Sequence, residues 1–203
     1  MKLALTLILA LPLMAAGPLH TVAVATQDTV EYTGGVIHLA TGYGEVNVEP
    51  WDQPNVAVTV TRTTFRHTGQ DAQGKQYLQR IQVKVTRASN GDINIVTTFP
   101  GRNWLARTFH GLGDFNLDYR IQAPPNAKLA IDQHIGDVIV YGMSGNIDAH
   151  VHAGDVVIQL PSPEKAAIDA KTDLGSNFIE IPSDKSAAQH LRLRSGIGGV
   201  TVQ

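Results

Sequence analysis

Imidazole and carboxylate side chains alternate with apolar residues in two short segments of the 203-residue chain. The first segment holds Asp132 and His134, and the second holds Asp148, His150 and His152. Residues two apart in a strand share a face, and neighbouring strands lie about 4.8 Å apart. If the glycines that follow the two segments align, His134 lies over His152. Asp132 then lies over His150. Zinc, nickel and copper accept such ligands, so the pattern predicts a divalent-metal site.

The same residues also fit a solvated surface. Ile147, Ala149 and Val151 alternate with them and are apolar, which places the histidines and aspartates on the outer face. Outward polar residues on a repeated sheet are ordinarily in contact with water. Both interpretations stay open at this point. A metal- or carboxylate-dependent hydrolase or lyase acting on a polysaccharide would use this outward ladder.

A second group of candidate residues lies in the segment from Pro100 to Phe115, which we expect to be a loop between strands. Aromatic and arginine side chains are enriched at contact surfaces. The loop therefore predicts either a binding patch for a partner or glycan, or a cap in which Trp104, Leu105 and Phe109 cover an end of the sheet. The binding candidates are Arg102, Trp104, Arg107, Phe109 and His110.

Several classes of function are excluded by what the sequence lacks. There is no cysteine, which excludes disulfides, thiolate metal sites and a cysteine nucleophile. No G-x-S-x-G, H-E-x-x-H or phosphate-binding Gly-Lys-Ser/Thr motif occurs. The formal net charge is -2 and there is no basic stripe, so we expect no nucleic-acid partner. No cofactor is predicted apart from the divalent metal.

These side chains are embedded in a recurring motif of glycine, a polar residue, and two branched residues separated by one position. Glycine with a short polar neighbour makes a turn, and alternating Val and Ile make a strand with one buried face. Repeats near 20 residues indicate stacked units that bury their faces together. We therefore predict an all-β fold whose residues 124–203 form the short coils of a β-solenoid. The clearest copies begin at Gly44, Gly91, Gly136, Gly154 and Gly198.

The preceding part of the domain, residues 26–123, predicts longer and largely antiparallel strands. Asn90-Gly91 is a strong hairpin dipeptide. Helix formers occur at 164–171 and 184–190, but the alternation of Ile168 with Ala170, and of Leu191 with Leu193, favours strands. The long strands are expected at Val36–Val48, Asn55–Thr64, Tyr77–Ala88 and Asp92–Phe99.

Residues 1–25 have the order of a secretory signal peptide. Lys2 precedes an uncharged run from Leu3 to Leu13, which is shorter than the roughly 20 residues that span a bilayer. Ala23-Val24-Ala25 offers a cleavage pattern, and an earlier cut near Ala16 is the alternative. An uncleaved anchor is less consistent with so short a run. We expect a single domain at 26–203, without a transmembrane anchor, that is soluble in the periplasm or outside the cell.

The mature chain resembles an exported bacterial β-strand-repeat domain of unknown function that is often labelled putative adhesin. The resemblance rests on the stretches 46–52, 56–60 and 119–129 and on the Gly-Asp-Val repeats that follow. It implies a β-solenoid without established enzyme chemistry. The loop from Pro100 to Phe115 departs from the usual pattern.

The leading functional hypothesis is a non-enzymatic envelope protein, adhesin-like or a scaffold. Its sheet faces and the loop at 100–115 would contact another cell-envelope component, either protein or glycan. The polysaccharide hydrolase or lyase is the second hypothesis. The third is an assembly subunit, because the segment 198–203 predicts a final strand that either pairs within the fold or exposes an edge for self-association.

Overall fold

The computed structural model describes residues 18–99, 115–161 and 165–203 and consists almost entirely of strands. The prediction of an all-β fold is confirmed. Only one helix, α1 (Asp71–Gln79), occurs in these residues. The strands are β1 (Leu19–Glu31), β2 (Val36–Tyr43), β3 (Glu45–Pro50), β4 (Asn55–His67), β5 (Gln82–Arg87), β6 (Ile93–Thr98), β7 (Asn116–Ala123), β8 (Lys128–Ile135), β9 (Val138–Tyr141), β10 (Ile147–Ala153), β11 (Val156–Gln159), β12 (Ala166–Leu174), β13 (Asn177–Ile179), β14 (Gln189–Ile197) and β15 (Val200–Val202).

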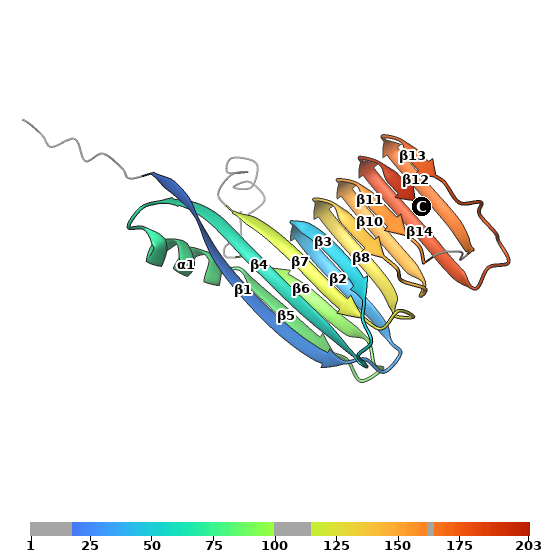
Figure 1. Cartoon of the computed structure of the whole chain (residues 1–203), viewed down its shortest axis with the longest axis horizontal. Coiled ribbons are helices and arrows are strands. Elements are labelled where there is room, and N and C mark those ends of the chain that lie inside the picture. The colour runs from blue at the N-terminus through green and yellow to red at the C-terminus, as the bar shows by residue number, and fades with distance from the viewer. Residues whose placement is uncertain (1–17, 100–114, 162–164) are drawn as a thin grey trace, which may run out of the picture.

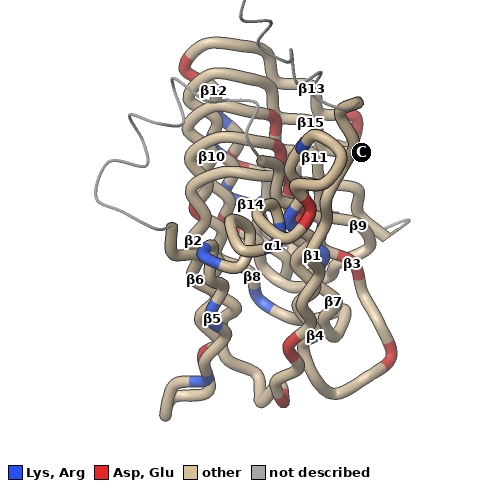
Figure 2. The backbone as a smooth tube through the Cα atoms, turned by 90° about the vertical axis from the view of Figure 1, so that its left-hand side faces the viewer, with Lys and Arg blue, Asp and Glu red and all other residues tan. Residues whose placement is uncertain are grey.

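The strands form two mixed sheets that face each other (Figures 1 and 2). Sheet A has the order β1-β4-β7-β3-β9-β11-β15-β13, and sheet B has the order β12-β14-β10-β8-β2-β6-β5. The chain crosses from one sheet to the other after almost every strand from β6 onward. A layer of the stack consists of one strand from sheet B and the next strand along the chain, which lies in sheet A. The layers are β2 with β3, β6 with β7, β8 with β9, and so on to β14 with β15, and strands of these neighbouring layers pair in parallel. Antiparallel pairing is confined to β1, β4 and β7 in sheet A and to β5 and β6 in sheet B.

A column of glycines turns the chain from sheet B into sheet A in successive layers. Gly136, Gly154 and Gly198 have φ angles of 122°, 144° and 141°, a region that favours glycine. Each also leaves no room for a side chain, because a Cβ atom on Gly154 would lie 2.1 Å from the carbonyl oxygen of Gly136. The carboxylate of Asp155 accepts a hydrogen bond of 2.6 Å from the N–H group of Gly199. The recurring Gly-Asp motif therefore builds the corner of the stack.

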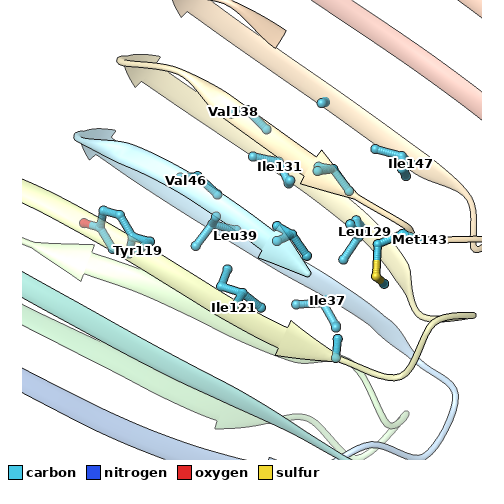
Figure 3. Packing of buried hydrophobic residues seen from close by; sticks show 14 of the residues in the cluster. Ile37, Leu39, Val46, Tyr119, Ile121, Leu129, Ile131, Val138, Met143 and Ile147 are labelled. Carbon is cyan, nitrogen blue, oxygen red and sulfur yellow. The ribbon is translucent and has the colours of Figure 1, made fainter. Parts of the chain in front are cut away.

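The core lies between the sheets and follows the two-residue alternation of the strands (Figure 3). Ile37 and Leu39 from sheet B face Val46 and Ile121 from sheet A, and all four are almost completely buried. Each such side chain contributes about 1.5–3 kcal/mol through its burial. The residues between them point outward, and this outer face is polar on β10 but largely apolar on β9.

The last two layers are stacked in the reverse of their chain order. Strands β14 and β15 pair with β10 and β11, while β12 and β13 lie at the end of the stack. Leu193 and Val202 in the interior layer are fully buried, whereas Ile179 in the terminal layer is 42% exposed. The two layers differ in burial because β14 and β15 have a neighbouring layer on each side, whereas β12 and β13 have one on a single side.

Two predicted strands of the N-terminal half are wrong in part. The strand expected at Val36–Val48 is divided at Gly44 into β2 and β3, which belong to different sheets and pair with parallel neighbours. The strand expected at Tyr77–Ala88 begins as helix α1 and continues as β5. Helix α1 packs on β1 and β4, and the fully buried Leu78 is its apolar contact. The strands β4 and β6 match their predicted positions.

The N-terminal strand includes residues that the sequence assigns to a signal peptide. Strand β1 pairs with β4 along its full length, from Leu19 opposite His67 to Glu31 opposite Asn55. Val22 is buried, and Ala25 lies in the middle of this pairing. A cut after Ala25 would remove the first seven residues of β1.

The final strand pairs within the fold, which selects the first of the two alternatives considered above. Strand β15 lies between β11 and β13 in sheet A, so the alternative of a free edge on the C-terminal strand does not apply. The free edges at that end belong to β12 and β13. Across the residues that the structure describes, no helix has the length and apolar character needed to cross a membrane.

Candidate functional site

The predicted histidine and aspartate ladder lies on the outer face of sheet B. Strands β8 and β10 are adjacent and parallel, and His150 pairs in register with Asp132. The rings of His134 and His152 lie 4.6 Å apart between their centroids. The prediction that Asp132 lies beside His150, and His134 beside His152, is therefore confirmed.

Three of the five residues converge. Nδ1 of His150 lies 3.7 Å from Oδ1 of Asp132, and Nε2 of His152 lies 4.0 Å from the same oxygen. One ligand atom from each of the three lies within 4.8 Å of the others. Asp148 instead contacts the neighbouring strand β14, where its Oδ2 lies 3.5 Å from Nη1 of Arg192. His134 contacts His152 but is not among the three converging ligands.

Two arginines of β14 border the ladder and are held by other carboxylates. Arg194 donates hydrogen bonds to the carboxylate and the carbonyl oxygen of Asp169, and this contact lowers the pKa of Asp169. Arg192 pairs with Asp148. Both guanidinium groups are engaged away from Asp132, whose carboxylate faces imidazole rings instead.

An open groove of about 530 Å³ on sheet B is lined by three residues of the ladder, Asp132, Asp148 and His150. The small side chains of Ala40 and Ala130 line it beside Asp132, because they face outward in β2 and β8. The side chains of Asp132, His150 and His152 are 62%, 47% and 52% exposed. Hydrolytic sites ordinarily withdraw their reacting groups from water. This groove can bind an ion or a polar ligand, but its exposure does not favour catalysis.

His38, Arg192 and Arg194 also line the groove and were not selected from the sequence. Nε2 of His38 lies 3.6 Å from Oδ2 of Asp92. The N–H group of Val36 donates to Asp92 over 2.8 Å, and this bond is the main reason that the pKa of Asp92 lies below its usual range. These three residues could not be selected because sequence spacing does not show that β2 lies beside β8 and that β14 lies beside β10.

The candidate residues Arg102, Trp104, Arg107, Phe109 and His110 lie outside the described residues. The two flanks of their segment meet, because the rings of Phe99 and Phe115 lie 5.9 Å apart. Phe115 also contacts Tyr43 at 5.5 Å between ring centroids. The alternatives of a binding patch and a cap for this loop both remain predictions.

Comparison with known proteins identifies the fold. No family model and no curated protein matches the sequence. Among solved structures, a putative cell adhesion protein from Clostridium sporogenes matches with a TM-score of 0.50 and 11% sequence identity. The match covers 89% of this chain and 98% of that chain. The two proteins share a fold.

Two further solved structures also carry adhesin names. A putative adhesin from Bacteroides fragilis has 11% identity and a TM-score of 0.31, and covers 89% of this chain and 97% of its own. A putative adhesin from Parabacteroides distasonis has 12% identity and a TM-score of 0.31, and the match covers 88% of this chain and 97% of that chain. With TM-scores of 0.31, these two structures carry no argument about individual residues of this chain.

Proposed function

We propose that the protein is a non-enzymatic, adhesin-like module of the bacterial cell envelope. The fold that it shares with a protein named for cell adhesion supports this role. So does the exposure of the ionisable groups in the groove, which suits surface contact better than hydrolysis or elimination. The polysaccharide hydrolase or lyase is not proposed, because no observation favours it.

The observation that carries the proposal is the open end of the stack. Strands β12 and β13 are the last strands of sheets B and A and have no strand partner on their outer sides in the described residues. The segment 183–184 already bonds to the edge of β12 at Ala166 and Ile168, so docking along the whole of β12 would displace these contacts. Such edges pair readily with further strands. Leu174 and Phe178 in this layer are 67% and 59% exposed. Their burial on docking would add to the backbone hydrogen bonds.

The occupant of this end is a second copy of the chain. A two-fold axis perpendicular to the sheets would pair β12 with β12 and β13 with β13, both antiparallel, and so continue both sheets. Asp169 and Lys171 share the outer face of β12. Antiparallel pairing centred on Ala170 places each Asp169 opposite Lys171 of the second copy, so the edge is complementary to itself in charge.

Sedimentation of the purified mature protein over a range of about 1–200 µM tests this arrangement. The wild type is expected to form a dimer as its concentration rises. Phe178→Lys places an unpaired charge in the contact and is expected to weaken association by at least about tenfold. A monomeric wild type over the whole range would contradict the proposed pairing.

Phe65→Lys provides the matched control, because Phe65 is 58% exposed and lies on β4 near the opposite end of the molecule. It adds the same charge to a phenylalanine of nearly equal exposure. Association unchanged in Phe65→Lys but weakened in Phe178→Lys locates the contact at the open end. Equal weakening in both variants would show a general effect of charge and would remove β13 from the proposal.

Three finer parts of the account also remain proposals. The parallel stack of two-strand layers supports a description of the fold as a short β-solenoid. The charge-then-apolar order of residues 1–16 supports export to the periplasm or the cell exterior. Contact with a further envelope component, protein or glycan, through the loop at 100–115 completes the proposed role.

A further inference from the structure

We infer that Asp132, His150 and His152 form a binding site for a transition-metal ion, and that Zn²⁺ fits it best. The site goes beyond the proposed docking function, because it lies on the outer face of β8 and β10 rather than at the open end. Its basis is the convergence of one ligand atom from each of the three side chains within 4.8 Å.

The distances approach those of tetrahedral zinc coordination. With Zn–N and Zn–O bonds of about 2.0–2.2 Å, two ligand atoms of a tetrahedral site lie about 3.3–3.6 Å apart. The oxygen of Asp132 lies 3.7 Å from His150 Nδ1 and 4.0 Å from His152 Nε2. Both separations exceed hydrogen-bond length, so no direct hydrogen bond has to be broken. Small rotations of exposed side chains bring all three atoms to one ion.

The backbone under the site holds the ligands at this spacing. Strand β8 pairs with β2 and β10, and β10 pairs with β8 and β14, so neither is an edge strand. Ile131, Ala149 and Val151 alternate with the ligands and are buried between the sheets. Ligands on strands that are paired on both sides and anchored by the core need little reorganisation to bind an ion.

The surrounding charges also favour a cation. Arg194 lies beside His150 in the next strand, but its guanidinium group is engaged by Asp169. Arg192 is engaged by Asp148. Among the described residues, the ionic contacts of the Asp132 carboxylate are those with the two imidazoles, so its negative charge is available to a bound ion.

The donor set selects the class of ion. Two imidazoles with one carboxylate suit zinc and the neighbouring transition metals, whereas Mg²⁺ and Ca²⁺ prefer oxygen ligands. Three protein ligands leave one tetrahedral position for water or an external group. His134 packs its ring against that of His152 at 4.6 Å. It is therefore assigned to positioning rather than to coordination.

Equilibrium dialysis of tag-free protein against Zn²⁺, followed by metal analysis, tests the site. The wild type is expected to retain one zinc ion per chain and to show no comparable retention of Ca²⁺. Asp132→Asn, His150→Ala and His152→Ala are each expected to weaken zinc binding by at least about tenfold. His190→Ala is the matched control, since His190 is an exposed histidine of the same sheet outside the cluster.

The outcomes are distinct because folding is monitored by thermal melting of each variant. Zinc lost from the three ligand variants but retained by His190→Ala supports the site. Absence of zinc from the wild type, or equal losses in His190→Ala, overturns it. His134→Ala is expected to weaken binding less than His150→Ala does. A larger loss in His134→Ala would place the ion elsewhere and would also contradict the assignment.

Discussion

At the scale of single residues, the glycines of the turns have two separate roles that the sequence presents as one. Gly34 has a φ angle of 92° and open space around its Cα atom, so it is needed only for the turn. Gly154 has a φ angle of 144° and also lies against the carbonyl oxygen of Gly136. The motif predicted the turns correctly, because glycine and aspartate act locally. The close contact between layers depends on strand order, which no local motif contains.

Substitution of Gly154 by alanine tests the role of the glycine column. Both the φ angle and the 2.1 Å approach to Gly136 oppose a Cβ atom, and the obstacle is backbone rather than a flexible side chain. We expect Gly154→Ala to lower the free energy of unfolding by more than about 4 kcal/mol. Gly34→Ala meets only the backbone preference and is expected to cost about 1–3 kcal/mol. Chemical denaturation of the two variants measures the difference, and equal losses would remove the stacking contact from the explanation.

At the scale of elements, alternation of apolar and polar residues predicted most strands and the direction of their side chains. Strand β10 is an example, since Ile147, Ala149 and Val151 are buried and its histidines are exposed. Alternation did not predict where a strand changes sheet, because the pattern continues from β2 through Gly44 into β3. Helix α1 was missed because its sequence, DAQGKQYLQ, buries only Gly74 and Leu78 and has no helical apolar stripe.

Strand β1 leads to a prediction about maturation. Removal of residues through Ala25 would leave the β4 segment Thr61–His67 without its partner, and would expose a sheet edge. We therefore expect cleavage near Ala16, so that all of β1 is retained in the mature protein. Intact mass measurement of protein recovered after export identifies the site. A mature N-terminus at Thr26 would show that the fold does not require the first half of β1.

Asp92 joins the turn before β6 to the start of β2 and gives a pH-dependent prediction. Its pKa is lowered in the folded state from the ordinary value of 3.8, chiefly by the hydrogen bond from Val36. A lowered folded-state pKa means that the stabilisation is present above the ordinary value. It is then lost as the pH falls through the folded-state value. The difference in unfolding free energy between wild type and Asp92→Asn should therefore be larger at neutral pH than at about pH 3.

Chemical denaturation at the two pH values measures this difference. Asp52→Asn is a suitable control, because Asp52 lies in an exposed bend outside the contact between Asp92 and β2. A difference between wild type and Asp92→Asn that stays constant from neutral to acidic pH would contradict the role given to the Asp92 carboxylate.

At the scale of the whole molecule, the two ends of the stack differ. One end has the long antiparallel strands β1 and β4 with helix α1 against them, whereas the other finishes in the short layer of β12 and β13 (Figure 1). The sequence predicted stacked layers but left open whether the final strand pairs within the fold or exposes an edge. It could not predict that β15 lies inside sheet A, because the order of the last strands in the sheet is not contained in any local sequence pattern. The proposed metal site and the open end lie on different surfaces, so binding of an ion would not block the proposed pairing with a second copy.

Hydrogen exchange of the wild-type protein, below and above the concentration at which it associates, tests the central claim most directly. Pairing of the open ends would give the backbone N–H groups at the edges of β12 and β13 new hydrogen bonds. We predict slower exchange at high concentration in residues 166–179, with no change in β1 or β5 at the other end. Exchange in residues 166–179 that is independent of concentration, or protection confined to β1 and β5, would contradict docking through the open end.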